Sequence, residues 1–288
     1  MNTRATLAWS LRRELWEHRS VYIAPLVAAG IALLAFVVHV GKQAEILKAL
    51  LQVDSVKRMT VVAMPYGIMA SVILFTSFVV ALFYCLDALY AERRDRSILF
   101  WKSMPVSDRM TVLSKALVPM AVLPAVAFVV ALASQLLLVV ASGAVLAARG
   151  VDVGAVWSAL PLAQMTVVMA YGLVVHALWY APIYGWLLLV SAWAKKAPFL
   201  WAVFPVFAVF VFEKIAFDTS YLFSLVKYRF TGAMTEAFMP GASKGFVTTL
   251  DQLDPARFVA SPGLWLGLVA AGLFLVAAIR IRRSREPI

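Results

Sequence analysis

Long runs of apolar residues alternate with shorter polar segments along the whole chain. A helix needs roughly 20 mostly apolar residues to cross about 30 Å of hydrocarbon at 1.5 Å per residue. The pattern therefore predicts an all-α integral membrane protein with six transmembrane helices. The runs lie at about 21–40, 63–86, 116–143, 163–193, 197–217 and 261–279.

The fourth run, 163–193, is too long for a single upright helix. We expect it to tilt, to kink at Pro182 or to begin along the membrane interface. Prolines interrupt other runs as well, and lipid tolerates the lost hydrogen bonds only where neighbouring groups restore them. They permit bending, although kinked packing alone is a sufficient explanation for most of them. These prolines are Pro65, Pro119, Pro124 and Pro205.

The segment 1–20 is polar and precedes the first run. Leucines recur in it at helical spacing (Leu7, Leu11, Leu15), while Trp9 and Trp16 fall on the opposite side. Tryptophan, leucine and arginine together favour a helix in the lipid headgroup layer, with a disordered basic tail as the alternative. The first run is too long for a cleavable signal peptide and lacks a small-residue cleavage pattern. The remainder, 21–288, shows no repeated halves and is expected to form one membrane domain.

Composition supports the membrane class, because 63% of the residues are hydrophobic and the mean hydropathy is +0.88. The formal net charge is +11, but the basic residues cluster beside apolar runs, where they set orientation and contact anionic headgroups rather than nucleic acid. Of the 26 lysines and arginines, 16 fall on one side of the predicted topology and ten on the other. By the positive-inside rule, both termini and the loop 87–115 face the cytoplasm.

Few residues offer metal or redox chemistry. The single cysteine, Cys85, lies in an apolar run and has no partner for an intrachain disulfide. The three histidines, His18, His39 and His176, are scattered and make no metal site. We therefore expect no catalytic residue, metal or cofactor in this chain.

The cytoplasmic loop contains an apolar cluster, Ile98 to Trp101, inside the most densely charged part of the chain. Pro105 disfavours helix at the preceding residue, so the chain should bend there. Ser107 is the expected N-cap of a second helix, with Asp108 at the positive end of its dipole. A helix–bend–helix element held between two spans can transmit a force from outside the bilayer to both spans. The alternative is that Phe100 and Trp101 lie in the aromatic belt at the interface.

The stretch "LYAERRDRSILFWKSMPVSDRMTVLSK" resembles the cytoplasmic loop of permease subunits of type-2 ABC transporters. The resemblance rests on Glu92-Arg93, on Pro105-Val106-Ser107 and on Lys115. "WYAPIYGWLLLVSAWAKKAPFLWAVFP", 179–205, resembles the junction of the fourth and fifth spans in one bacterial branch of that family. Many members carry a glycine where this chain has Asp95-Arg96-Ser97.

The resemblance implies that 87–115 forms a coupling helix that docks on a separate ATPase subunit, present in two copies. It further implies that 1–20 is a connecting helix, that two permeases surround one pathway, as a homodimer or with a close paralogue, and that the segment 218–260 caps the pathway outside. The implied location is the bacterial inner membrane, as a multi-pass protein. The implied coupling residues are Glu92, Arg93, Arg96, Phe100, Trp101, Pro105, Ser107 and Lys115.

Nucleotide is expected on that partner, together with Mg²⁺. The phosphate-binding pattern G-x-x-x-x-G-K-[ST] does not occur in the sequence. The "GASKG" at 241–245 lacks its spacing and the preceding strand. The chain itself is therefore not expected to be an enzyme.

Several polar and aromatic residues within the runs are candidates for substrate passage or gating. Glu213 is about 16 residues from the cytoplasmic end of its run, roughly 24 Å at helical rise, so it is expected near the outer interface beside Lys214. There it is either paired or part of a gate. His176 and Gln135 either join helices by hydrogen bonds or bind ligand. Aromatic residues either line a pathway or form the belt and core. These are Tyr171, Trp179, Tyr180, Tyr184 and Trp186.

The sequence thus predicts a permease subunit that forms the translocation pathway of an ATP-driven exporter. An intramembrane enzyme is a rival, with Glu213, His176 and Asp87 as its catalytic candidates, but these lie in different spans without motif spacing. A secondary transporter is a second rival, disfavoured by the lack of repeated halves and of several acids within the spans.

Overall fold

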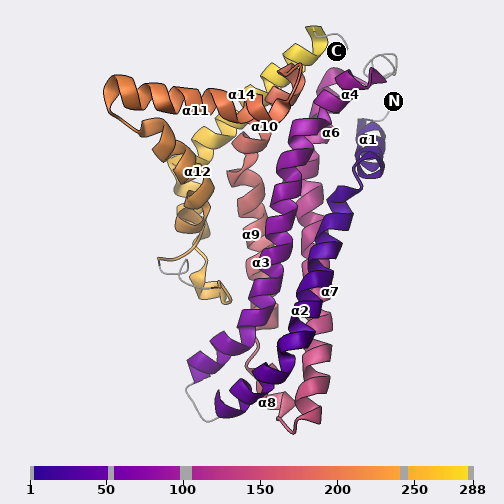
Figure 1. Ribbon diagram of the computed structural model, residues 1–288, viewed down its shortest axis with the longest axis vertical. Helices are drawn as coiled ribbons and strands as arrows, with labels where there is room; N and C mark the ends of the chain where they lie inside the picture. Colours follow the sequence, from indigo (N-terminus) through magenta and orange to yellow (C-terminus); the bar gives the residue numbers. More distant parts are fainter. Residues whose placement is uncertain (1–2, 51–54, 98–105, 241–245, 285–288) are drawn as a thin grey trace.

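The computed structural model describes residues 3–50, 55–97, 106–240 and 246–284 and is all-helical over them (Figure 1). Six of its helical segments are long and apolar enough to cross a membrane, which confirms the predicted number of spans. The segments are Ser20–His39, Met59–Arg94, Asp108–Ala148, Val156–Trp179, Pro198–Phe217 and Pro262–Ser284.

Three long rods lie side by side and make up the tallest part of the molecule (Figure 1). The first is α2 (Ser20–Leu50), which follows the N-terminal helix α1 (Thr3–Glu17). The second is α3 (Ser55–Ala88), extended after one turn by the short helix α4 (Tyr90–Arg94). In α1, Leu11 and Leu15 pack against the core while Trp9 and Trp16 point outward, as their spacing predicts.

The third rod runs from α6 (Asp108–Leu117) through the π-helical turn η1 (Val118–Val122) into α7 (Leu123–Ala148). Ser107 is the N-cap of α6, as predicted, and its hydroxyl accepts a hydrogen bond from the Met110 amide at 3.3 Å. The π-helical turn contains Pro119, which lacks the N–H that a regular helix uses at that position. Its wider geometry accommodates the proline without ending the rod.

The fourth apolar run is divided into two helices at the predicted place. After the short helix α8 (Val153–Ser158), α9 (Leu162–Trp179) ends at Tyr180, and α10 (Ala181–Trp193) carries Pro182 in its first turn. Proline is tolerated in a first turn, where an amide would have no helical partner, so the run kinks there instead of crossing as one rod.

The C-terminal third lies beside the rods and ends at the same end of the molecule as the N-terminus (Figure 1). There α11 (Pro198–Phe217) runs outward, crosswise to the rods, and α12 (Tyr221–Ala237) turns back along the molecule. The turn η3 (Leu250–Gln252) and α13 (Pro255–Ala260) lead to α14 (Pro262–Ser284), which packs along α10. At Gly185 an added Cβ would lie 3.2 Å from the Ala271 carbonyl oxygen, so glycine permits this close approach.

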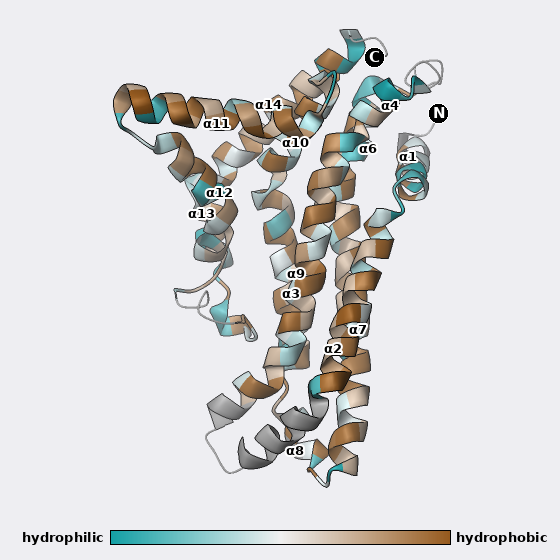
Figure 2. Ribbon diagram, viewed as in Figure 1, coloured by the Kyte–Doolittle hydropathy of each residue, from teal (hydrophilic) through white to brown (hydrophobic). Residues whose placement is uncertain are grey.

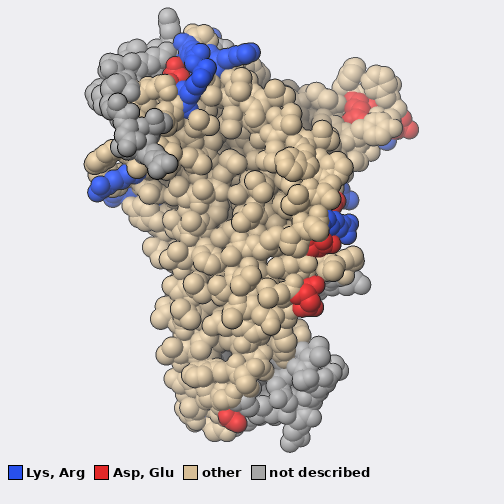
Figure 3. Space-filling view, turned by 180° about the vertical axis from the view of Figure 1, so that it is seen from behind, with Lys and Arg blue, Asp and Glu red and all other residues tan. Residues whose placement is uncertain are grey.

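Apolar side chains cover the sides of the molecule, and charged side chains gather at the end that carries the termini (Figures 2 and 3). A second group of charges lies along the side formed by the C-terminal third (Figure 3). On α11, only Ala202 is fully buried, and most of its large apolar side chains are exposed. Such a surface requires lipid or another protein around it.

The predicted six crossings can be tested by labelling single cysteines in a Cys85→Ala background. Asp95→Cys lies at the end that carries the termini, Ala148→Cys at the opposite end of the third rod, and Ser220→Cys in the turn between α11 and α12. If the predicted six crossings hold, an impermeant maleimide applied outside intact cells labels Ala148→Cys and Ser220→Cys but not Asp95→Cys, and α11 would then cross the membrane instead of lying crosswise to the rods. Labelling of Ser220→Cys only after permeabilisation would contradict a fifth crossing by α11.

Candidate functional site

The short helix α4 bears a carboxylate that is buried at the end of the spans. Glu92 is 4% exposed, and each of its two oxygens has a cationic partner. Oε1 lies 3.2 Å from Lys115 Nζ on α6 and 3.3 Å from an Arg13 nitrogen on α1. Oε2 accepts a hydrogen bond from Arg282 on α14. One carboxylate thus connects four helices that are far apart in the sequence.

The cluster extends on both sides of Glu92 and is electrically balanced. The Lys115 ammonium group also lies 2.9 Å from Glu14 Oε1, and Tyr84 donates a hydrogen bond to Glu14 Oε2 at 2.7 Å. On the other side, Arg282 Nε lies 3.0 Å from Asp108 Oδ1. Three carboxylates therefore alternate with three cations. We call this set the α4 ion cluster: Arg13, Glu14, Glu92, Asp108, Lys115 and Arg282.

The next residue of α4 attaches a fifth helix. The Arg93 guanidinium donates to the carbonyl oxygens of Ala192 and Ala194, at 2.5 and 3.2 Å, where α10 ends. Carbonyl groups at a helix C-terminus lack helical partners, and a cation there is favoured by the dipole. Ser191 adds to the joint, because its hydroxyl accepts the amides of Leu89 and Tyr90 at 3.0 and 2.9 Å.

The predicted coupling residues therefore occupy different environments. Glu92, Arg93 and Lys115 are buried and bonded within the chain, and Ser107 caps α6. Arg96 is exposed and adopts a left-handed backbone with a φ of 58°, directly after α4. That conformation favours glycine, which many proteins of the resembled family carry in this stretch. Phe100, Trp101 and Pro105 lie outside the described residues.

Sequence reasoning found Glu92 and Lys115 but not the other four members of this cluster, which are Arg13, Glu14, Asp108 and Arg282. Glu14 lies among arginines in an amphipathic segment, and Arg282 lies in a basic tail that reads as a topology signal. The bonds that hold these residues in the cluster join positions between 79 and 190 residues apart, from Arg13 with Glu92 to Arg282 with Glu92. No rule of sequence spacing connects such positions. The local signal available was Glu14, an acidic residue directly after two arginines.

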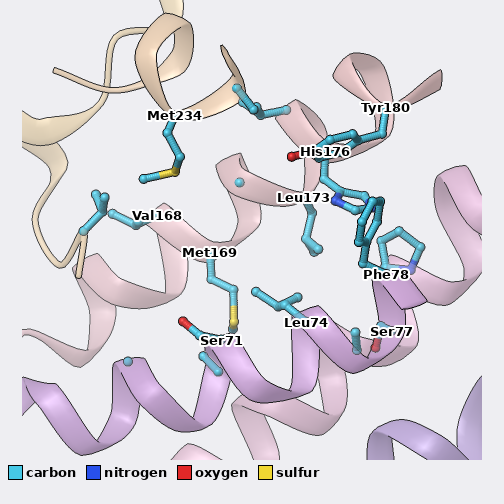
Figure 4. A pocket seen from close by; sticks show the side chains of 18 of the residues that line it. Ser71, Leu74, Ser77, Phe78, Val168, Met169, Leu173, His176, Tyr180 and Met234 are labelled. Atoms are coloured by element: carbon cyan, nitrogen blue, oxygen red, sulfur yellow. The ribbon is translucent and has the colours of Figure 1, made fainter. Parts of the chain in front are cut away.

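A cavity of about 410 Å³ lies inside the membrane-spanning part, between α3, η1, α7 and α9. Met234 and Phe238 of α12, with Phe246 and Val247, line its remaining side. Figure 4 shows Ser71, Leu74 and Phe78 of α3 facing Met169 and Leu173 of α9 across it.

The helix α12 is fastened beside the cavity by aromatic side chains of the fourth run. The Tyr171 hydroxyl donates to Ala237 O at 3.1 Å, Trp179 Nε1 to Arg229 O at 2.8 Å and the Tyr180 hydroxyl to Phe230 O at 3.1 Å. Arg229 in turn donates to the carbonyl oxygens of Trp179 and Gly263. These aromatic residues were predicted either to line a pathway or to form the belt and core. In the structure they hold α12 against one side of the cavity.

The candidate gating residues fall into two separate places. His176, Tyr180 and Tyr184 lie together at the break between α9 and α10, where His176 Nε2 and the Tyr184 hydroxyl are 2.6 Å apart. His176 and Tyr180 also line the cavity beside Phe78 (Figure 4). Gln135 lines it too, and its amide joins α7 to α3 by donating to Tyr66 O at 3.4 Å.

Glu213 lies away from the cavity lining, at the turn between α11 and α12. Its carboxylate accepts the amides of Tyr221 and Leu222 at 2.5 and 3.0 Å, where α12 begins. It thus satisfies donors that the helix itself leaves unbonded. Lys214, its expected neighbour, pairs instead with Asp218 at 2.6 Å.

The described residues contain one group with the spacing of metal ligands, Glu14, Glu17 and His18. Its carboxylates are already engaged by cations and a hydroxyl: Glu14 by Lys115 and Tyr84, and Glu17 by Arg13. A metal ion would have to approach the Lys115 and Arg13 charges. The group is better described as the outer part of the α4 ion cluster.

Comparisons of the chain with protein-family models, with curated proteins and with solved structures gave no match. A functional assignment therefore has to be argued from the residues and the geometry described above.

Removing one charge of the α4 ion cluster should be strongly destabilising. Lys115→Met leaves the Glu14 and Glu92 carboxylates buried without the ammonium between them, and breaking a buried ion pair commonly costs about 3–5 kcal/mol. We expect a lowered thermal unfolding midpoint in detergent, partly restored by adding Glu14→Gln.

Lys214→Met is the matched control, because it breaks an equally short but exposed ion pair with Asp218. Exposed pairs contribute about 0–1 kcal/mol, so its midpoint should stay near that of the unmodified chain. Equal midpoints for the two variants would contradict a stabilising role of the cluster.

The docking of α1 should depend on pH through His18. Burial of the ring lowers the pKa of His18 below its usual value, with Lys115 acting in the same direction and Glu14, Asp87 and Glu17 opposing it. The neutral ring is thus favoured in the folded chain, and its stabilisation is present above about pH 6.5 and lost as the pH falls through the folded pKa. We expect proteolysis between α1 and α2 to accelerate from pH 7.5 to 5.5, and His18→Phe to reduce that acceleration. The same pH dependence in His18→Phe would assign it to other groups.

Proposed function

We propose that this chain is the membrane-spanning permease subunit of an ATP-driven exporter and that it works with a separate ATPase. The observation that carries the proposal is the α4 ion cluster. It joins both ends of the segment 95–107 to the N-terminal and C-terminal helices, as a part that receives force from outside the bilayer requires.

The bonds on either side of this segment suit it to transmit a force to the spans, which a loop that only connects two spans would not need. Glu92 precedes the segment and Lys115 follows it, and the two are bonded to each other. Arg93 extends the joint to α10, whose other end lies at the break beside the cavity. A displacement of the segment would therefore reach α1, α6, α10 and α14 together.

In this proposal two copies of the permease, or one and a close paralogue, enclose the pathway, and two ATPase subunits bind ATP and Mg²⁺. The helix α1 is the connecting helix in the headgroup layer, with Arg12 stacked between the exposed rings of Trp9 and Trp16 at 5.5 and 4.9 Å. The end with the termini faces the cytoplasm and the membrane is the bacterial inner membrane. The exposed apolar surface of α11 is available to the second permease copy or to lipid.

The mechanism is a shift between two states. Closure of the ATPase subunits around ATP stabilises one position of the segment 95–107, and the spans follow because the buried ion pairs hold them to it. The proline-containing break before α10 and the π-helical turn at Pro119 are the places where the spans can bend.

The rival proposal of an intramembrane enzyme has less support. The residues that line the cavity include no aspartate, glutamate or cysteine. Asp87 lies 3.8 Å from Arg94 near the end of the spans, and Glu213 caps α12. His176 therefore has neither of these acids as a partner for acid–base chemistry among the described residues.

The proposal predicts that the purified chain alone hydrolyses no ATP and that it co-purifies with an ATPase when the two are expressed together. Phe100→Ala with Trp101→Ala should weaken that association roughly thirtyfold in detergent, because truncating aromatic anchors of an interface commonly costs about 2 kcal/mol or more. Detergent removes the bilayer interface, so a lost membrane anchor would have no effect in this measurement.

Trp9→Ala with Trp16→Ala is the matched control, because it removes two exposed aromatic side chains from the same end of the molecule. We expect it to retain the ATPase. Full retention by the Phe100 and Trp101 double variant, or equal loss in both double variants, would contradict docking through the loop.

A further inference from the structure

The intramembrane cavity is long and narrow. Along α9 its lining extends from Met165 to Tyr180, which is 15 residues or roughly 22 Å at helical rise. Its volume of about 410 Å³ lies at the lower end of the range for small-molecule sites, about 300–1,000 Å³. A linear molecule matches this shape better than a compact one.

The part of the cavity wall that the structure describes is mostly apolar. Among those lining residues there is no aspartate, glutamate, lysine or arginine. Most of its polar side chains already have partners within the chain. The Ser77 hydroxyl donates to Ile73 O at 2.8 Å, His176 is bonded to Tyr184, and the Tyr180 hydroxyl donates to Phe230 O. A charged ligand would lose its hydration in this wall without gaining a counter-ion.

Gln135 is the buried exception, because one of its polar atoms is unsatisfied, whereas Ser71, the remaining polar lining residue, is exposed. The side chain is 2% exposed, and Oε1 has no hydrogen-bond partner. The orientation of the amide follows from its other bond: Nε2 faces the Tyr66 carbonyl, which can only accept. A buried acceptor without a donor is unfavourable, so a ligand that supplies an N–H or O–H gains free energy there.

Near Gln135 the cavity is partly covered by a side chain outside the spans. Phe246 packs directly on Gly67, the residue after Tyr66, where an added Cβ would lie 2.7 Å from the Phe246 ring. Both residues line the cavity, and Met234 of α12 covers its side (Figure 4). Oε1 lies just beneath the cavity surface, so a ligand in the cavity would bond it after a small turn of the Gln135 side chain, which lines the cavity.

We propose that this cavity binds an elongated, uncharged amphiphile, of the class of long-chain alcohols and amides, whose hydrogen-bond donor pairs with Oε1 of Gln135. That this molecule is the exported cargo rests on the proposed function, whereas the binding itself does not. Such a molecule can come from the membrane or from the medium, and the experiment separates the two sources.

The test uses the full chain in lipid nanodiscs, without an ATPase, and a long-chain alcohol that carries a photoreactive diazirine. We expect saturable labelling of peptides from α3, α7 and α9. The methyl ether of the same probe cannot donate a hydrogen bond, so its labelling should require about tenfold higher concentration. This comparison needs no variant of the protein and is unaffected by misfolding.

Two variants test the site itself. Gln135→Met removes the acceptor at similar size and should bring the alcohol to the level of the ether. Gly172→Leu should abolish labelling, because Gly172 lines the cavity and an added Cβ meets nothing within 4 Å, so the larger side chain enters the open space. Gly30→Leu is its matched control, since Gly30 on α2 also has open space around it but is not part of the lining. Gly30→Leu should be labelled like the unmodified chain.

The source is read from native mass spectrometry of the purified chain before any probe is added. A bound molecule that is displaced by the alcohol, and is missing in Gly172→Leu, identifies a membrane lipid as the occupant. An empty cavity that the alcohol then fills identifies an occupant from the medium.

Equal labelling by alcohol and ether, or undiminished labelling of Gly172→Leu, would overturn the proposal. Failure of ATPase co-purification would instead affect only the proposed function and would leave the binding result in place.

Discussion

The burial of the Glu92 carboxylate is the constraint on which the arrangement of one whole end of the molecule depends. A carboxylate that is 4% exposed is tolerated only when cations and hydrogen bonds replace its hydration. Here the replacements come from Arg13, Lys115 and Arg282, on three different helices. The N-terminal helix, the third rod and the C-terminal helix must therefore meet at α4 at the same time. Because Lys115 and Arg282 are also the partners of Glu14 and Asp108, removing either cation would leave a carboxylate uncompensated, which favours a single arrangement of this end.

The cavity depends on the opposite principle, since its described lining carries no charged side chain and Gln135 Oε1 is buried in it without a partner. The two sites are connected through α10. Arg93 holds its far end at α4, and Tyr180 and His176, at its near end, line the cavity. A kink at Pro182 was one of the three arrangements expected for the fourth run, and the break observed there separates a half that belongs to the charged end from a half that lines the cavity.

The spans were predictable from the sequence because membrane insertion depends on the local sum of hydropathy over about 20 residues. The N-cap at Ser107 and the break before α10 were predictable for the same reason: each depends on a few adjacent residues. The α4 ion cluster was not, since whether Glu92 meets Arg282 depends on how helices 190 residues apart pack. Glu213 is a related case. Its residue type left open whether it is paired or part of a gate, and its carboxylate accepts the first amides of α12, a bond set by the turn after α11. The unsatisfied oxygen of Gln135 is likewise visible only after every neighbouring donor has been placed.

The contact between Gly185 and Ala271 gives the C-terminal half a mechanical property. Two helices whose backbones approach this closely cannot slide or roll past each other without separating, so α10 and α14 are expected to move as one rigid unit. At the end near α4, two adjacent residues of α4 hold this pair of helices: Arg93 donates to a carbonyl oxygen at the end of α10, and Glu92 pairs with Arg282 of α14. The opposite end of α10 can pivot at Tyr180, where α9 ends and α10 begins. A tilt of α4 would therefore rotate α10 and α14 together about Tyr180. His176 and Tyr180, which lie nearest this pivot, would move with it and change the width of the cavity that they line.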